Sequence, residues 1–288
     1  MKRERDLTKK LVESSIMIAF ATVLSMLKLV DMPYGGSVTA ASMLPIVIIA
    51  YRHGIGMGLA SGLVFATIQQ LLGLNTLSYV TGWQSVVAVI LLDYVLAFTI
   101  VGFGGIFKGK LSALSIEPAR KQSIELGLGM ALVCILRYIC HTVAGATVWA
   151  GLSIPDEAAL VYSVGYNATY MIPETIVTTL AAVWIGSVLD LSRRTPERFA
   201  PVSAGNEVRG SACELLPQLA ALISVLTVAA DTVLIAPHLQ NADSGEFDFS
   251  GLSAAPWVAI AIVSAVGCVS VVALILAKRF MSAKKTDV

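Results

Sequence analysis

The sequence predicts an all-α integral membrane protein, and two observations carry that prediction. Of the 288 residues, 56% are hydrophobic and only 14% are charged, well below the roughly 25% charged residues of a soluble domain. The mean hydropathy is +0.79, and the chain divides into apolar stretches of about 20 residues, the length an α-helix needs to cross a bilayer. Strands of a membrane barrel would instead alternate apolar and polar residues over about ten positions. The spans are therefore expected to be helices.

Eight apolar stretches follow one another along the chain. The second is short enough to be tilted or partly re-entrant, whereas the others have full helical length. Their approximate ranges are 11–30, 38–50, 55–74, 80–107, 124–152, 158–191, 215–235 and 257–277.

The basic residues indicate which side of the membrane each connection faces. All Lys and Arg residues except Lys28 and Arg137 fall in the first ten residues, at 52, in 108–121, in 193–209 or after 277. Lys and Arg are retained on the cytoplasmic side of a membrane. The pattern therefore predicts a multi-pass protein of the plasma membrane with both termini in the cytoplasm. A full span follows MKRERDLTKK without an A-x-A site, so no cleavable signal peptide is expected.

A polar linker divides the chain into two membrane parts. Residues 196–213 contain Pro, Gly and Ser and are flanked by basic residues, as expected of a domain boundary. The predicted organisation is a membrane domain in 1–195, a cytoplasmic linker in 196–213 and two further transmembrane helices in 214–288. The last two helices could pack beside the first domain, bind another subunit or modify docking.

Several classes of function find no support in the sequence. The four Cys residues lie in or beside apolar segments without a C-x-x-C pair, so they are expected to be packing residues rather than disulfides or zinc ligands. No Walker A pattern, H-E-x-x-H or G-x-S-x-G is present. The net charge of +1 gives no indication of a nucleic-acid partner. We therefore expect no cofactor, no metal and no catalytic residues.

Polar residues inside apolar helices are candidates for function, because ionisable groups at bilayer depth cost several kcal/mol unless they face a cavity or a partner. The fourth, fifth and sixth stretches carry most of them. They are Asp93 and Tyr94 in 80–107, Arg137, His141 and Trp149 in 124–152, and Tyr162, Tyr166, Asn167 and Tyr170 in 158–191.

Spacing groups these residues further. Arg137, His141, Gly145 and Trp149 recur every four residues, which puts them along one helix face. The small Gly145 would let a flat ligand approach the backbone there. Asp93 can face this stripe, and aromatic rings, a carboxylate and hydrogen-bonding groups suit a small, flat, cationic aromatic ligand.

Simpler interpretations remain open. Asp93 and Arg137 could pair only to neutralise each other, His141 could be a hydrogen-bond donor between helices, and the aromatic residues could belong to an interfacial belt.

The order and spacing of these pieces resemble the thiamine-binding S components of energy-coupling-factor (ECF) transporters, of the ThiT type. The matching stretches span about residues 10 to 195. They are SMLPIVIIAYRHGIGMGLASGLVFATIQQLLG, LLDYVLAFTIVGFGGIF, LRYICHTVAGATVWAG and YSVGYNATYMIPE. The resemblance implies a six-helix S-component bundle with a substrate pocket near the outer face, here followed by two additional transmembrane helices.

The resemblance also implies a set of site residues. Its substrate-binding positions fall on Asp93, Tyr94, His141, Trp149, Tyr162 and Asn167, with Tyr34 and Trp83 as further aromatic candidates and Arg137 in support. Its small-residue docking face for a coupling subunit corresponds to Ser15 and Ala19 with Val23 next, or alternatively to Ala21 and Ser25, and this match to the family is imperfect.

Two further departures from the family pattern matter. The family usually has Glu where this chain has Asp93, which sets the carboxylate roughly 1 to 1.5 Å back, and the six-helix family lacks the last two spans. We therefore expect a subunit that captures thiamine from outside, for ATP-driven uptake by a transmembrane coupling subunit and two ATPases. The alternatives are the uptake of a thiamine precursor or another small vitamin, a membrane enzyme that uses Asp93 and His141, and a non-transporting scaffold.

Overall fold

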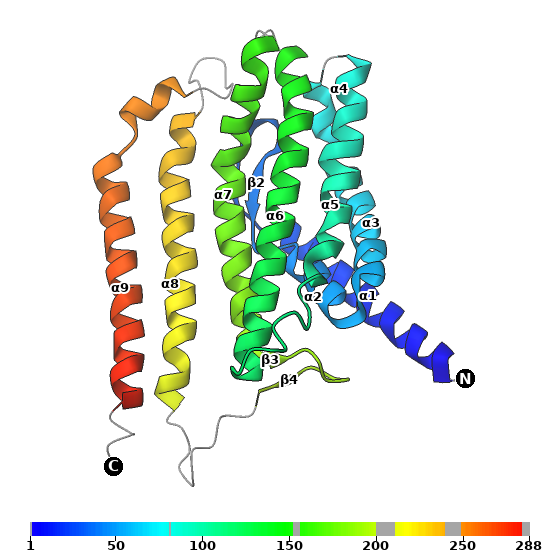
Figure 1. Ribbon diagram of the computed structural model, residues 1–288. Coiled ribbons are helices and arrows are strands. Elements are labelled where there is room, and N and C mark those ends of the chain that lie inside the picture. The colour runs from blue at the N-terminus through cyan, green and yellow to red at the C-terminus, as the bar shows by residue number, and fades with distance from the viewer. Residues whose placement is uncertain (1, 81, 152–155, 200–210, 240–248, 284–288) are drawn as a thin grey trace. The chain divides into compact units, whose positions relative to one another are not determined.

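The protein forms two compact units in the computed structural model, residues 1–196 and residues 197–288 (Figure 1). We call them the bundle unit and the C-terminal unit. The structure describes residues 2–80, 82–151, 156–199, 211–239 and 249–283. The architecture is all-α, with a six-helix bundle followed by two additional long apolar helices.

The first half of the bundle unit contains three helices and a small hairpin. In chain order the elements are α1 (Lys2–Met26), β1 (Lys28–Asp31), the single turn η1 (Pro33–Gly35), β2 (Ser37–Thr39), α2 (Leu44–His53), α3 (Ile55–Leu72) and η2 (Leu74–Tyr79). Strands β1 and β2 pair antiparallel, with Val30 opposite Val38 and Asp31 opposite Ser37. At the tip, Tyr34 has φ 63° and Gly35 has φ 96°, the left-handed conformation that a tight turn requires.

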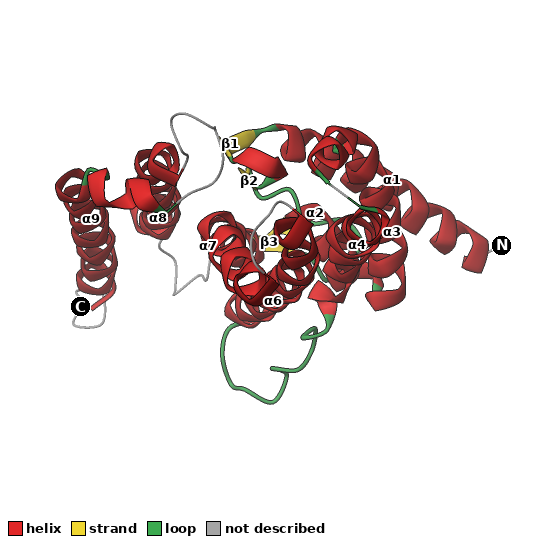
Figure 2. Cartoon of the chain, turned by 90° about the horizontal axis from the view of Figure 1, so that it is seen from above, coloured by secondary structure: helices red, strands yellow, loops and turns green. Residues whose placement is uncertain are grey.

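The second half contains one composite helical segment and two long helices. The composite segment runs through α4 (Trp83–Ala88), the π-helical η3 (Val89–Leu96), α5 (Ala97–Thr99) and the 3₁₀-helical η4 (Ile100–Gly105). Helices α6 (Pro118–Gly151) and α7 (Asp156–Val188) follow, and β3 (Leu189–Asp190) ends the unit. Seen from above, α6 and α7 lie side by side with α2 next to them (Figure 2).

Small residues let the helices of the bundle unit approach closely. A Cβ atom at Gly102 of η4 would clash with the backbone of Gly58 and Leu59 in α3, and one at Gly129 of α6 would clash with the carbonyl of Gly104. Glycine is therefore required where these backbones meet. Beside these contacts the core is filled by fully buried apolar side chains, among them Met43, Ile46, Phe65, Leu126 and Met130.

The C-terminal unit is a helical hairpin. It contains β4 (Glu197–Arg198), α8 (Ser211–Ile235), η5 (Ala236–Leu239), η6 (Ser250–Ala254) and α9 (Trp257–Ala283). Helices α8 and α9 pack against each other, and a Cβ atom at Gly267 of α9 would meet Thr227 of α8. Most of their large apolar side chains are exposed, as expected of helices that face lipid.

Six helices among the described residues are long and apolar enough to cross a membrane. They are Ile55–Leu72, Trp83–Gly105, Pro118–Val148, Ala158–Val188, Leu216–Leu239 and Trp257–Met281. Helix α1 has sufficient length, but Lys9, Lys10 and Glu13 interrupt its apolar run, and α2 has only ten residues.

The first two expected ranges therefore differ from the structure. The helix expected in 11–30 ends at Met26, because residues 28–31 turn into the hairpin. The helix expected in 38–50 begins only at Leu44, where Pro45 occupies the first turn, a position that proline favours.

Candidate substrate-binding site

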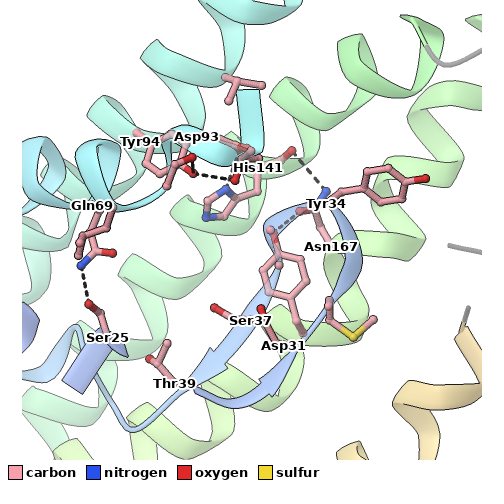
Figure 3. A pocket seen from close by; sticks show the side chains of 18 of the residues that line it. Ser25, Asp31, Tyr34, Ser37, Thr39, Gln69, Asp93, Tyr94, His141 and Asn167 are labelled. Carbon is pink, nitrogen blue, oxygen red and sulfur yellow. Dashed lines mark hydrogen bonds and ion pairs between the residues drawn. The ribbon is translucent and has the colours of Figure 1, made fainter. Parts of the chain in front are cut away.

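A cavity of about 580 Å³ lies within the bundle unit. Its walls come from the β1–β2 hairpin, the ends of α1 and α3, the turn η2, the π-helical η3, and the long helices α6 and α7. The close view in Figure 3 shows Asp93, Tyr94, His141 and Asn167 from three of these elements directed toward the same space, with Tyr34 on the hairpin.

The polar centre of the cavity is a chain of three side chains. His141 Nδ1 lies 2.7 Å from Asp93 Oδ1, and Arg137 Nη2 lies 3.3 Å from His141 Nε2 (Figure 3 shows the first contact). Arginine can only donate hydrogen bonds, so Nε2 must accept and the proton must sit on Nδ1. The ring is then neutral and donates to the Asp93 carboxylate. Arg137 therefore reaches Asp93 through His141, and the direct pair considered from the sequence is replaced by this relay.

Arg137 is held by neighbours from several elements. Its side chain is buried, its Nη1 contacts Met43 Sδ, and its guanidinium carbon lies 4.5 Å from the ring centre of Phe98. A guanidinium over an aromatic face is favourable because the ring carries negative electrostatic potential on that face. The cation is thus fixed in position within the wall of the cavity.

Helix α7 contributes an amide and two phenols. Asn167 Nδ2 donates to Ser163 O at 2.9 Å, and Asn167 Oδ1 accepts from the Tyr170 hydroxyl at 2.5 Å. The Tyr166 hydroxyl accepts from Gly36 N at 3.2 Å, and the Tyr166 ring packs edge to face on Tyr34 with centroids 6.4 Å apart. These contacts tie the tip of the hairpin to α7 at the cavity.

A second carboxylate, Glu174, lines the cavity and was missed by the sequence reasoning. Its side chain is 2% exposed. It accepts hydrogen bonds from Thr39 N at 2.6 Å and from Thr39 Oγ1 at 2.8 Å, so it fastens β2 to α7. The signal that found Asp93, an acid inside an apolar range, is also present in the stretch YMIPETIV.

Gly145 has a different role from the one expected. It lies on the cavity wall, but a Cβ atom there would come within 2.5 Å of Ser163 Oγ and 3.1 Å of Asn167 Nδ2. The missing side chain therefore lets α6 approach α7, and α7 rather than a ligand occupies the space.

The structure brings most, but not all, of the expected site residues together. Asp93, Tyr94, His141, Asn167, Tyr34 and Arg137 all line the cavity. The Tyr94 hydroxyl donates to Gly73 O at 3.1 Å, so this residue also fixes the end of α3.

Other expected residues lie elsewhere. Trp83 begins α4 and is 72% exposed, and Tyr162, one turn before Tyr166, is not part of the lining. The side chain of Trp149 lies outside the described residues. Ser15 and Ala19 lie on an exposed face of α1, away from the cavity.

The charges around the cavity do not cancel. Counted as formal charges, Asp93 and Glu174 each contribute one negative charge, Arg137 contributes one positive charge and His141 is neutral in the relay, while Lys28 and Asp31 form their own pair at 2.9 Å. One negative charge is therefore left over in a wall lined with tyrosines. Such a site can neutralise a small monocation and hold its rings against aromatic faces. No cluster of His, Cys, Asp or Glu arranged for a metal ion occurs within the described part of the chain.

Apolar helices around a polar, aromatic-lined cavity are typical of multi-pass membrane proteins that bind a small solute. Comparison with known proteins identifies the family within this class. Residues 11–190 match the profile of the family described as thiamine transporter protein (Thia_YuaJ). The chain belongs to this family, which consists of transporters and not of enzymes.

One curated relative agrees with this assignment, and one solved structure shares the fold. The chain is 31% identical over 174 residues to the thiamine transporter ThiT of Bacillus subtilis, and the alignment covers 59% of this chain and 86% of that protein. Its fold resembles the crystal structure of ThiT from Listeria monocytogenes, with a TM-score of 0.51 at 24% identity, over 65% of this chain and 95% of that one. The family match ends at residue 190, so α8 and α9 lie beyond it.

Proposed function

We propose that this protein is the substrate-capture S component of an ECF transporter and that it binds thiamine in the cavity of the bundle unit. The observation that carries the proposal is a cavity lined by tyrosines in which Asp and Glu side chains outnumber Lys and Arg side chains by one, in a chain of the thiamine transporter family. Thiamine carries one permanent positive charge on its thiazolium ring. A ligand of this charge completes the neutralisation of the buried groups.

Each side chain has a role that follows from its chemistry. Asp93 supplies the negative charge opposite the cation, and His141 and Arg137 hold its carboxylate in place. Asn167 and Tyr170 provide hydrogen-bonding groups for the aminopyrimidine ring, and Tyr34 and Tyr166 present aromatic faces. By the family resemblance we also assign Trp149 a ring-stacking role, and Tyr94, Tyr162 and Trp83 supporting roles at or near the site.

The direct test is titration of the purified full-length protein with thiamine in detergent, followed by calorimetry. We expect one site per chain. The substitution Asp93→Asn keeps the size of the side chain and removes its charge, so the Kd should rise roughly 30-fold, which corresponds to about 2 kcal/mol for a lost charge-assisted contact.

The chain offers a matched control for this variant. Asp231→Asn makes the same change in an apolar helix of the C-terminal unit and should leave the Kd within about twofold. A folded wild-type sample that shows no heat of binding up to millimolar thiamine would refute the thiamine assignment. Pyrimidine and thiazole relatives would then be titrated, because a shorter acid at position 93 could favour a precursor.

The second part of the proposal concerns energy coupling. We infer that a transmembrane coupling subunit docks on the exposed face of α1 that contains Ser15 and Ala19, and that two ATPases drive uptake from the outer face toward the cytoplasm. Small residues on that face allow close helix contact. We also propose that both termini are cytoplasmic, that residues 1–195 form the capture domain, and that the linker 196–213 joins it to a separate helical pair in 214–288.

Docking can be tested apart from binding. Ser15→Trp or Ala19→Trp should abolish ATP-dependent uptake in cells that express the coupling subunit and ATPases, yet leave the calorimetric Kd unchanged. Thr67→Trp, on the exposed surface of α3, is a control for the added bulk. Normal uptake by both α1 variants would show that this face is not the docking surface.

A further inference from the structure

A second cavity lies at the C-terminal ends of α2 and α7, whereas the substrate cavity borders the middle of α7 and the residues before α2. It measures about 320 Å³ and is lined by the beginning of α1, the last residues of α2 and the segment after α7. Tyr170 of the substrate cavity and the end of α7 at Val188 are 18 positions apart, which is roughly 27 Å along an α-helix. We call this second cavity the basic cavity, because Lys9, Lys10, Arg52, Arg193 and Arg194 all line it.

The wall of the basic cavity is a fixed structure. The Arg52 side chain is only 4% exposed, and its guanidinium donates to both carboxylate oxygens of Glu13. The same guanidinium donates to Leu191 O at 2.7 Å and to Arg193 O at 3.2 Å. Arg52 therefore joins α1, α2 and the segment after α7 into one rigid rim.

Two of the basic residues are neutralised by neighbours. Arg52 is paired with Glu13, and Arg193 Nε lies 3.1 Å from Asp190 Oδ2. Burial raises the pKa of Asp190, but hydrogen bonds from Ser192 and from the Arg193 guanidinium outweigh this effect and hold the pKa below its ordinary value. The Asp190 carboxylate therefore remains charged and balances Arg193.

The remaining cations are in excess. Lys9 donates to the carbonyl of Arg194 at 2.5 Å, which leaves its charge uncompensated. Lys10 and Arg194 have no carboxylate partner among the residues that the structure describes. Against these three cations the lining contains one further acid, Asp6. The basic cavity thus has an excess of about two positive charges, concentrated in a concave site where the field of several charges adds.

Exposed apolar side chains lie along α1, close in sequence to the lysines of the basic cavity. Leu7 and Leu11 of α1, which flank Lys9 and Lys10 in the sequence, are 53% and 52% exposed, and Ile16 further along the helix is 64% exposed. A basic site at the end of apolar helices, beside an exposed apolar face, matches the amphiphilic shape of a membrane lipid with a phosphate headgroup.

We propose that the basic cavity binds a phosphate group, carried either by an anionic phospholipid or by a soluble phosphate compound. Lys10 and Arg194 are its principal ligands, since their charges are free, whereas Arg52 shapes the rim. The site is separate from the substrate cavity and does not depend on the identity of the transported solute.

The test uses the full-length protein without thiamine. In one arm, lipid binding is measured by native mass spectrometry with phosphatidylglycerol and with zwitterionic phosphatidylcholine. In the other arm, thermal stability in detergent is followed with sodium phosphate and sodium pyrophosphate against sodium chloride of equal ionic strength. The double variant Lys10→Gln/Arg194→Gln is compared with Lys278→Gln/Arg279→Gln, which removes the same two charge types from the exposed end of α9.

We expect wild-type protein to retain phosphatidylglycerol in preference to phosphatidylcholine. The Lys10/Arg194 variant should bind phosphatidylglycerol roughly 30-fold more weakly, the factor for two basic contacts of about 1 kcal/mol each, and the Lys278/Arg279 variant should not. Stabilisation by phosphate or pyrophosphate with the same dependence on the two variants would identify the soluble compound as the source. Equal losses in both double variants, or no preference in either arm, would overturn the proposal.

Discussion

Asp93 and Asp231 both lie within apolar helical segments of this protein, and their surroundings differ sharply. Asp93 in η3 lines a cavity and is joined through His141 to the buried Arg137. Asp231 in α8 accepts one hydrogen bond, from Ser264 Oγ of α9 at 2.6 Å, and its other carboxylate oxygen is buried without a partner. The first acid belongs to a charged network around open space, and the second to a contact between two helices.

An acid beside a cavity and an acid between packed helices of a membrane segment differ in the groups around them. Hydropathy treats the two residues alike, because both interrupt an apolar run. Only the supporting groups separate them: a fixed cation, a histidine of defined tautomer and a cavity lined with phenols on one side, and a single serine on the other. Substituting the residues around the cavity one at a time tests whether they set Asp93 apart from Asp231.

The largest effect is expected for Arg137→Gln. It removes the cation and leaves Asp93 and Glu174 without a balancing charge, so the free energy of unfolding should fall by about 3 kcal/mol, as when one partner of a buried charge pair is lost. Thermal unfolding in detergent measures the loss. Arg193→Gln, at a pair whose guanidinium side is 60% exposed, should change stability by less than about 1 kcal/mol. Equal losses would mean that the network does not stabilise the fold.

The charge of the ligand gives the next effect. A thiamine analogue with an uncharged ring in place of thiazolium should bind wild-type protein roughly 30-fold more weakly than thiamine. In the Asp93→Asn variant, the Kd values of the two ligands should differ by only a few fold. The difference is a coupling of about 1 to 2 kcal/mol between the two charges. Calorimetry on the four combinations measures it. Unchanged discrimination in the variant would show that Asp93 does not face the cation.

Glu174→Gln should have a smaller effect, a rise of roughly tenfold in the Kd for thiamine. Glutamine keeps one oxygen that accepts a hydrogen bond from Thr39, but it loses the charge. Its amide group also places an N–H donor opposite a donor of Thr39, so the contact between β2 and α7 should weaken by about 1 to 1.5 kcal/mol. Stopped-flow fluorescence should assign the change to faster release.

The matched control is Glu125→Gln. Glu125 is also buried, and it accepts from the Tyr51 hydroxyl at 2.7 Å away from the cavity, so this variant should lose stability but keep its affinity. If both variants bind thiamine normally, Glu174 serves the fold alone.

The smallest effect on thiamine affinity is expected from removing a tyrosine hydroxyl group at the cavity. Tyr170→Phe removes the donor to Asn167 Oδ1 and should weaken binding three- to tenfold, since one hydrogen bond contributes about 0.5 to 1.5 kcal/mol. Tyr138→Phe removes a hydroxyl that donates to Val164 O on the exposed side of α6, and its affinity should equal that of the wild type. A similar loss in both would point to a general effect on helix packing.

Much of the fold and part of the candidate site could be predicted from the sequence. Helix α6 is a regular helix, so a spacing of four residues correctly puts Arg137 and His141 on one face of it. The two C-terminal helices followed directly from length and hydropathy.

The remaining features depend on contacts that the pattern does not encode. The hairpin of residues 28–39 occupies stretches apolar enough to be taken for helices, and its position depends on Glu174 and Tyr166 far along the chain. Tyr162 and Trp83 have the right residue types, but the rotation and ends of their helices leave them out of the lining.

The π-helical turn that carries Asp93 has an evolutionary consequence. In η3 the amide of Ala97 bonds to the carbonyl of Leu92, five residues earlier, so this turn holds about one residue more than an α-helical turn. Deleting one residue within Val89–Leu96 would restore α-helical pairing while the flanking segments kept their register. The direction in which the Asp93 side chain points therefore depends on the number of residues in this turn. During evolution, an insertion or a deletion in the turn could change that direction as effectively as a substitution.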